Sequence, residues 1–277
     1  MNKTGKRLLT FFIGIPIVLA IVYVDYLNHL PLQIVIGVFS ILAANEFYTM
    51  LQPKVALFSK PVVLILSAIL PYISYLFILA DMSLELTPWF FICECILLMA
   101  LECFRAKTFE KSASKVAYSC LIIFYCGLLM TFLSRLTVLE NSRYIISLFL
   151  ILVFICDSLA WFFGILFGKG SRGYVAASPN KSIVGFVGGI ISSIASGVLF
   201  KVLFPQIITT SYLNIILIGF FTAIASIVGD LIESVFKRFC DVKDSGNLIP
   251  GRGGVLDSID SILISAPIFY ICYHFLF

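Results

Sequence analysis

The chain has 277 residues, of which 61% are hydrophobic and only 12% are charged, with a formal net charge of +4 at pH 7. A mean hydropathy of +1.08 gives it more apolar surface than one soluble core can bury, so a soluble globular protein is excluded and the membrane is the expected solvent. No basic patch with interleaved aromatic residues occurs, so nucleic acid is not an expected partner. The eight cysteines show no CxxC spacing and indicate neither a zinc site nor a disulfide framework.

Nine segments are long and apolar enough to cross a membrane, which takes about 20 residues. We therefore expect an all-α, polytopic integral membrane protein with about nine transmembrane helices. The first segment follows three cationic residues as a signal peptide does, but no small-residue cleavage site follows it, so we expect an uncleaved helix. The nine segments are residues 8–27, 31–51, 61–80, 86–104, 116–134, 144–168, 182–204, 212–236 and 255–277.

The distribution of Lys and Arg residues predicts the orientation of these helices. If the N-terminus lies in the cytoplasm, all of the 19 Lys and Arg residues fall in cytoplasmic segments except Arg135, Arg143 and Lys201. Cytoplasmic loops of membrane proteins carry such an excess of positive charge. The pattern predicts a cytoplasmic N-terminus, and it places the polar stretch after Asp230 on the cytoplasmic side.

The chain divides by its content of polar residues. Residues 1–143 are expected to form N-terminal transmembrane helices, and residues 144–277 a C-terminal catalytic region with cytoplasmic loops. In the second region Asp157 lies inside an apolar segment, where its ionised form costs several kcal/mol unless it is paired or binds a metal. The glycines at 185, 188 and 189 fit close helix packing, and equally fit backbone contact with a phosphate.

The stretch from Asp230 to Ser261 is the most polar of the chain. In a helix, its first side chains follow the i, i+3, i+4, i+7, i+8 spacing and share one face. The residues of that face are Asp230, Glu233, Ser234, Lys237 and Arg238. A solvated loop with surface ion pairs and a proton or ion relay are alternative interpretations of this stretch.

The carboxylates of this stretch are candidate ligands of a hard divalent cation, because magnesium is usually held by one or two carboxylates together with substrate phosphates. The candidate metal ligands are Asp230, Asp244, Asp257 and Asp157. The cations Lys237, Arg238, Lys243 and Arg252 are available for phosphate oxygens. The glycines at 251, 253 and 254 allow backbone amides to approach an anion.

These residues resemble the signature of the phosphatidate cytidylyltransferase family, also called CDP-diacylglycerol synthases. The matching C-terminal positions are Ser234, Lys237, Arg238, Lys243, Asp244, Pro250, Gly251, Gly253, Gly254, Asp257 and Asp260. The matching upstream positions are Asp157, Gly168, Lys169, Ser178, Pro179, Lys181, Gly185, Gly188 and Gly189. The resemblance covers roughly residues 150–277, and the front half only through its apolar segments. Arg252, Ser258 and Val184 stand where the family usually has histidine, arginine and glutamate.

The resemblance implies an enzyme that joins CTP and phosphatidic acid to give CDP-diacylglycerol and pyrophosphate. It implies that the reaction depends on magnesium, and a second bound cation is left open. It implies catalytic roles for the six residues Asp230, Lys237, Arg238, Lys243, Asp244 and Asp257. It implies substrate binding by Ser234, Lys181, Arg252, Gly251, Gly253 and Gly254. The expected location is the bacterial inner membrane, with membrane lipids as neighbours, the active site facing the cytoplasm, and a homodimer left open.

Three other functions are kept as alternatives. A CTP-dependent lipid-alcohol kinase would also use a nucleotide and a metal ion, but it would release CDP. A catalytically silent lipid-binding homologue is compatible with the changes at Arg252 and Ser258, although Arg252 supplies a cation where the arginine expected at 258 is missing. A transporter would show paired broken helices in two repeats, and this pattern is not found.

Overall fold

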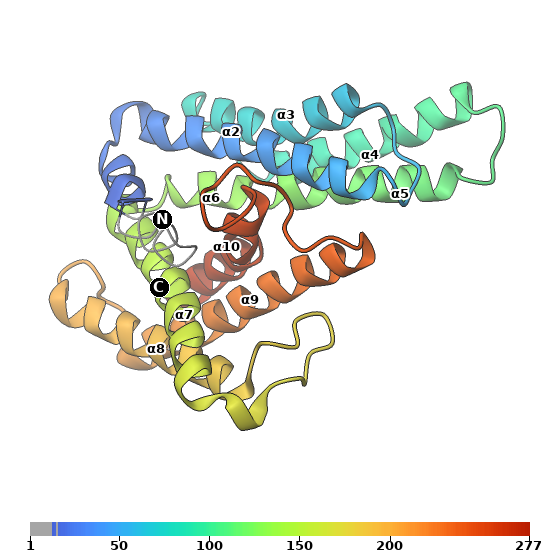
Figure 1. Cartoon of the computed structure of the whole chain (residues 1–277). Coiled ribbons are helices and arrows are strands. Elements are labelled where there is room, and N and C mark those ends of the chain that lie inside the picture. The colour runs from blue at the N-terminus through green and yellow to red at the C-terminus, as the bar shows by residue number, and fades with distance from the viewer. Residues whose placement is uncertain (1–12, 15) are drawn as a thin grey trace. The chain divides into compact units, whose positions relative to one another are not determined.

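The computed structural model describes residues 13–14 and 16–277, and its regular structure is helical (Figure 1). Residues 8–12 and 15 of the first predicted span, residues 8–27, lie outside the described residues, and residues 16–23 are helical. Within the described part there is no β-strand, and only two isolated bridges, Arg172 to Ser182 and Ile249 to Gly253, occur in loops. The prediction of an all-α protein is confirmed.

Eight helical segments among the described residues are long and apolar enough to cross a membrane. They are α2 (Tyr26–Leu51), α3 (Lys60–Leu79), α4 (Leu86–Arg105), the segment Ser112–Leu136, α7 (Ser142–Phe167), α8 (Ile183–Leu203), α9 (Tyr212–Phe239) and α10 (Leu256–Leu276). Each corresponds to a span predicted from hydropathy, and most ends agree within a few residues. The chain is therefore a polytopic integral membrane protein, while the count of nine spans and the cytoplasmic N-terminus stay predictions.

Two local features interrupt this regularity. Residues 27 to 29 have positive φ values of 48°, 52° and 60°, so Tyr26 is separated from the regular part of α2 that follows. The span Ser112–Leu136 consists of α5 (Ser112–Ile122), the π-helical segment η1 (Ile123–Leu128) and α6 (Thr131–Leu136). The amide of Leu129 donates to the carbonyl of Phe124, five residues earlier, which is the hydrogen bond of a π-turn.

The described residues form two compact units. The first runs up to Val138 and also includes Cys240–Ser258, so it contains α2 to α6 and the loop that precedes α10. The second consists of Leu139–Phe239 and Ile259–Phe277, and so contains α7, α8, α9 and all of α10 after its first turn. The division of function predicted between residues 143 and 144 stays a prediction, and the compact units do not follow it because residues 240–258 belong to the first unit.

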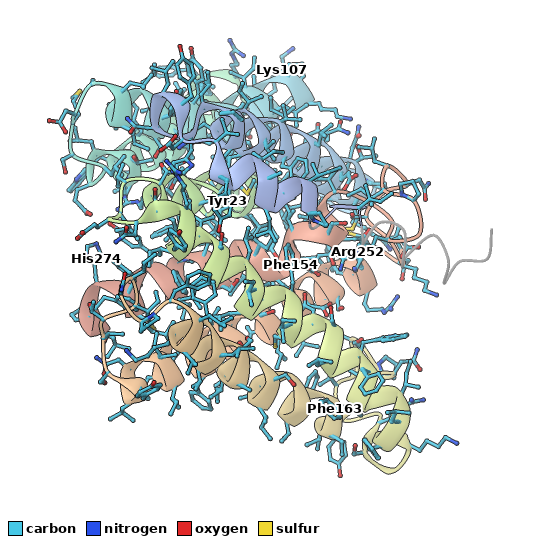
Figure 2. All side chains as sticks on the ribbon, turned by 90° about the vertical axis from the view of Figure 1, so that its left-hand side faces the viewer. Tyr23, Lys107, Phe154, Phe163, Arg252 and His274 are labelled. Carbon is cyan, nitrogen blue, oxygen red and sulfur yellow. The ribbon has the colours of Figure 1, made fainter. Side chains whose placement is uncertain are left out.

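Glycines in the second unit permit close packing of α7 against α8. A Cβ atom on Gly185 would lie 2.7 Å from the carbonyl oxygen of Ala160, and one on Gly189 would lie 2.9 Å from that of Cys156. Figure 2 shows Phe154 and Phe163 along α7, and the ring of Phe163 covers Gly188, whose Cβ would meet it at 2.5 Å. Of the two interpretations of these glycines, the structure supports helix packing.

Candidate active site

Two clusters of polar residues, one in each unit, contain several of the predicted site residues. We call the group in the second unit the helix cluster, and the group in the first unit the loop cluster. The helix cluster contains Asp157, Lys181, Ser226, Asp230, Asp260 and Ser261. The loop cluster contains Glu46, Ser245, Gly254 and Asp257. Each is described by its own contacts.

The helix cluster is centred on the Asp157 carboxylate of α7. Its Oδ1 atom accepts a hydrogen bond of 2.9 Å from the hydroxyl of Ser226 on α9 and one of 3.4 Å from the hydroxyl of Ser261 on α10. Ser226 and Ser261 are both buried. The prediction that a carboxylate at this depth needs polar partners is met by two hydroxyls from neighbouring helices, and α7, α9 and α10 converge at this point.

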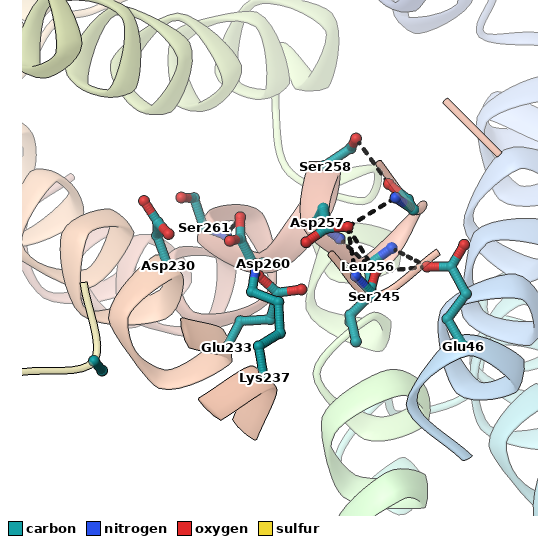
Figure 3. Close-up of polar contacts among 12 residues, drawn as sticks. Glu46, Asp230, Glu233, Lys237, Ser245, Leu256, Asp257, Ser258, Asp260 and Ser261 are labelled. Carbon is teal, nitrogen blue, oxygen red and sulfur yellow. Dashed lines mark hydrogen bonds and ion pairs between the residues drawn. The ribbon is translucent and has the colours of Figure 1, made fainter. Parts of the chain in front are cut away.

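Asp230 lies one helical turn after Ser226 on α9. Its carboxylate forms an ion pair with Lys181, which belongs to the loop before α8. Figure 3 shows Asp230 beside Asp260 and Ser261 of α10. The close approach of the two helices depends on Gly229, because a Cβ there would lie 2.6 Å from the carbonyl oxygen of Asp260. The sequence therefore places the carboxylate of Asp230 next to the helix crossing itself.

Negative charge exceeds positive charge in the helix cluster. Asp260 is buried, with 7% of its surface exposed, and it experiences the negative charges of Asp230, Glu233 and Asp157. Glu233 is completely buried and forms an ion pair with Lys237 on the next turn of α9. Buried carboxylates that repel one another need a cation or a shared proton to be stable. The cluster is therefore suited to a positively charged ligand.

The loop cluster is organised by Asp257 in the first turn of α10. Its Oδ2 atom accepts hydrogen bonds from the amide of Ser245 at 2.8 Å, the hydroxyl of Ser245 at 2.9 Å and the amide of Gly254 at 2.7 Å. Just before this turn, Ile249 and Gly253 exchange two backbone hydrogen bonds of 2.8 and 3.1 Å. The glycine turn, which we define as residues 249–254, is thereby closed on itself.

Glu46, near the C-terminal end of α2, completes the loop cluster (Figure 3). Only 8% of this residue is exposed. Its two carboxylate oxygens accept hydrogen bonds from the amides of Val255 and Leu256 and from the hydroxyl of Ser245. The amide of Leu256 is the first of α10, so Glu46 satisfies donors that have no partner within that helix.

Several other predicted residues lie on α9 or in the loop before α10. Lys243, Asp244 and Arg252 are exposed in the loop before α10. Arg238, near the end of α9, is exposed and donates from its Nε atom to the carbonyl oxygen of Ala177 at 3.1 Å. Ser234 is buried. Of the predicted substrate-binding residues, Gly251 and Gly253 have positive φ values of 82° and 120°, which glycine adopts without strain.

The donors of the helix cluster are the kind that hard cations prefer. They are carboxylate and hydroxyl oxygens, with no sulfur or imidazole ligand among Asp157, Ser226, Asp230, Asp260 and Ser261. Throughout residues 13–14 and 16–277, no group of three or more His, Cys, Asp and Glu side chains is arranged to hold a metal by itself. Magnesium commonly takes only one or two carboxylates from the protein, so these residues fit it together with substrate oxygens.

The chain belongs to the cytidylyltransferase family. The family model described as "Cytidylyltransferase family" matches residues 5–276, which is nearly the whole chain. This family membership is consistent with the polytopic membrane fold and with the polar clusters inside and beside its helices.

Among curated proteins the chain is similar to bacterial proteins named phosphatidate cytidylyltransferase. It is 38% identical to that of Bacillus subtilis (strain 168) over 43% of this chain and 44% of the relative. It is 42% identical to one from Staphylococcus epidermidis over 47% of this chain and 48% of the relative. For the protein of Haemophilus influenzae the values are 39%, 57% and 56%. The matches thus span about half the length of these relatives.

Five contributors to the clusters were not predicted as site residues, namely Asp260, Ser261, Ser226, Ser245 and Glu46. Asp260 was named only as a position that matches the family signature and Ser261 only as the end of the polar stretch, although the i, i+3, i+4 spacing from Asp257 places both on one side of α10. Ser226 precedes Asp230 by four residues, and this spacing was a usable signal for a shared helix face. Glu46 offered only its position near the end of an apolar span, and nothing local in the sequence pointed to the loop.

Proposed function

We propose that the chain transfers a cytidylyl group from CTP to phosphatidic acid, giving CDP-diacylglycerol and pyrophosphate. The observation that carries the proposal is the family match across residues 5–276. The names of the bacterial relatives support the choice of phosphatidic acid as the acceptor. The integral membrane fold is consistent with it, because the lipid substrate and product remain in the bilayer.

The reaction requires little covalent chemistry from the protein. A phosphate oxygen of phosphatidic acid attacks the α-phosphorus of CTP, the new phosphorus–oxygen bond forms, and the bond to the β-phosphate oxygen breaks as pyrophosphate leaves. The acceptor oxygen is already anionic, so no protein nucleophile is required. The main barrier is the approach of two polyanions, and positioning with charge neutralisation lowers it.

The residues of the chain have corresponding roles in this proposal. Asp230 and Asp157, together with the neighbouring Asp260, would hold magnesium, which supplies positive charge to phosphate oxygens. Lys181 forms an ion pair with Asp230 and keeps its carboxylate in place. Asp257 and Asp244 remain predicted ligands in the first unit, where three hydrogen bonds to Asp257 also give it a role in ordering the loop.

The cationic residues are proposed to bind phosphate. Arg252 and Lys243 are exposed in the loop of the first unit, and Arg238 is exposed near the end of α9 in the second. Arginine and lysine in such positions neutralise phosphate charge, and arginine adds a bidentate geometry. Lys237 is engaged in an ion pair with the buried Glu233, which supports a role in holding α9 rather than direct contact.

The test is pyrophosphate release by the purified protein in detergent with CTP, phosphatidic acid and magnesium. We expect release only when all three are present, loss of release with EDTA, and recovery when magnesium is restored. Asp230→Asn should lower turnover at least about 100-fold, as expected when a charge that acts in the transition state is removed. Asp241→Asn is the matched control, because Asp241 is exposed and forms an ion pair with Lys54 at the surface.

The products separate the proposal from its alternatives. Release of CDP with a phosphorylated lipid would support the lipid-alcohol kinase. Lipid binding without formation of pyrophosphate or CDP would support the silent homologue. In that case Asp257→Ala would change the amount of neither product.

Location and assembly are also part of this proposal. The positive charge in alternate loops supports an inner-membrane orientation in which the loop before α10 faces the cytoplasm. In a variant whose eight native cysteines are replaced by alanine, a cysteine introduced at the exposed Leu248 should react with a membrane-impermeant thiol reagent in inside-out vesicles and not in intact cells. A homodimer stays a prediction.

A further inference from the structure

The carboxylate of Glu46 connects α2 to the loop before α10 through three hydrogen bonds. Its Oε1 atom accepts from the amide of Val255 at 2.9 Å, and its Oε2 atom accepts from the amide of Leu256 at 2.8 Å and from the hydroxyl of Ser245 at 3.0 Å. These three bonds join residues separated by 199 to 210 positions in the sequence. All of them lie within the first compact unit.

Glu46 acts on the start of α10 in two ways. The amides of the first helical turn have no partners inside the helix, and Glu46 accepts from one of them and from the residue just before. A negative charge is also favourable at the positive end of the helix dipole. Both effects hold Val255 and Leu256 directly after the glycine turn, so the turn is anchored at its C-terminal end.

Ser245 links Glu46 to Asp257. Its hydroxyl lies 3.0 Å from Oε2 of Glu46 and 2.9 Å from Oδ2 of Asp257, so its single proton serves one of the two carboxylates at a time. The amide of Asp257 donates in turn to the same hydroxyl oxygen at 3.3 Å. The first turn of α10 and the start of the loop are therefore held by one connected set of hydrogen bonds.

The space around the Glu46 carboxylate accounts for two glycines. A Cβ atom on Gly246 would lie 2.6 Å from Oε1 of Glu46, which is closer than real contacts of this kind. A Cβ atom on Gly254 would collide with Oε2 of Glu46 and with the hydroxyl of Ser245. Gly254, the last glycine of the glycine turn, thus leaves room for the Glu46 carboxylate and the Ser245 hydroxyl, and its φ is not in the left-handed region.

We propose that Glu46 is a positioning residue for nucleotide binding: it fixes the glycine turn and the first turn of α10, so that Arg252 and the amides of the turn are held ready for the phosphates of CTP. This inference rests on the proposed function for the identity of the ligand. Glu46 acts through the loop and does not touch the nucleotide. A merely structural Glu46 would stabilise the fold without changing affinity for one substrate.

The test compares Glu46→Gln with Glu102→Gln. Glutamine keeps the shape of glutamate but has one acceptor oxygen, and its NH₂ group would face a backbone donor, so at least one hydrogen bond is lost. Glu102 is a matched control because it is also 8% exposed and accepts hydrogen bonds from Ser112 and Lys115, away from the loop.

The first readout is hydrogen exchange of the purified full chain in detergent, measured by mass spectrometry. In Glu46→Gln, we expect peptides covering residues 245–257 to exchange about tenfold faster than in the wild type, while peptides of α3 and α8 remain unchanged. Glu102→Gln should leave the loop peptides unchanged. Equal loop exchange in wild type and Glu46→Gln would overturn the proposal, as would equal acceleration in both variants.

The second readout is kinetic. Glu46→Gln should raise the KM for CTP about tenfold, with the KM for phosphatidic acid changed less than about twofold, because the loss falls on the groups that bind the nucleotide. Equal changes in both KM values, or a change in kcat alone, would contradict positioning of the nucleotide site. Glu46→Asp retains the charge and should recover part of the CTP affinity.

A double-mutant cycle tests the contact itself. Gly246→Ala should disturb the loop strongly in the wild type and much less in a Glu46→Ala background, because the three atoms nearest to a Cβ on Gly246 all belong to the Glu46 side chain. Additive effects on loop exchange would refute the contact. Because exchange needs no turnover, it decides the role of Glu46 in the loop even if no pyrophosphate is released, and absent pyrophosphate would count against the proposed function alone.

Discussion

Gly229 offers a direct test of the helix crossing beside Asp230. In Gly229→Ala, the new Cβ atom would lie 2.6 Å from the carbonyl oxygen of Asp260, 3.1 Å from Cα of Ser261 and 3.2 Å from Cβ of Ile264. Two of these three atoms belong to the backbone, so no side-chain rotation relieves the contact. We expect α9 and α10 to move apart locally, although the substitution adds only one methyl group.

The size of the effect follows from two opposing contributions. Alanine in a helix is favoured over glycine by about 1 kcal/mol, whereas overpacking at a tight contact costs about 1–3 kcal/mol. Gly37→Ala isolates the first contribution, because Gly37 is also inside a helix and a Cβ there meets nothing within 4 Å. The difference in stability between the two variants is therefore the overpacking cost alone, about 1–3 kcal/mol.

The consequence for activity is expected to be larger than that for stability. Asp230 follows Gly229 directly, and Ser261 belongs to the helix that must shift. A misplacement of about 1 Å among groups that position a reaction can lower the rate about 100-fold. We expect Gly229→Ala to lose pyrophosphate release to about this extent and Gly37→Ala to keep the wild-type rate.

Both quantities are measured on the same detergent preparations, by thermal unfolding and by pyrophosphate release. The expected pattern is a lower midpoint in Gly229→Ala than in Gly37→Ala, and a large loss of rate in Gly229→Ala only. The reasoning would be refuted if the two alanine variants had equal midpoints and rates, because the close contact between α9 and α10 would then not exist in the protein.

Three further predictions concern charged side chains. Lys237→Met removes the ion-pair partner of the buried Glu233 and should destabilise the protein by about 3 kcal/mol, seen as a lower unfolding midpoint; an unchanged midpoint would contradict a buried pair. Lys54→Met breaks a surface pair with Asp241 and should leave the midpoint unchanged, so a shift like that of Lys237→Met would argue that this pair is not exposed. Arg252→His removes a permanent cation from the glycine turn and should raise the KM for CTP roughly tenfold at pH 8, whereas an unchanged KM would show that Arg252 does not contact phosphate.

The local pattern of the sequence was sufficient to predict the helices. Hydropathy placed the ends of most spans within a few residues, because a membrane helix satisfies its backbone internally and needs only a run of apolar side chains. The face of α9 that carries Asp230, Glu233 and Lys237 was also predictable, since it depends only on helical spacing, and the ion pair of Glu233 with Lys237 follows from it. The π-turn at 123–128 was not predicted, because its neighbouring residues are as apolar as those of a regular span.

The two clusters depended on tertiary structure to different degrees. Their apolar neighbours in the sequence marked Asp157 and Asp230 as polar groups inside apolar segments, but only the packing of α7, α9 and α10 supplied Ser226 and Ser261 as partners of Asp157. The catalytic and metal roles of these residues stay predictions. The role of Glu46 was beyond any local pattern, since its hydrogen bonds reach residues about 200 positions away. The sequence shows that a residue carries a carboxylate charge. The packing of segments that are distant in the chain decides which backbone amides this carboxylate contacts.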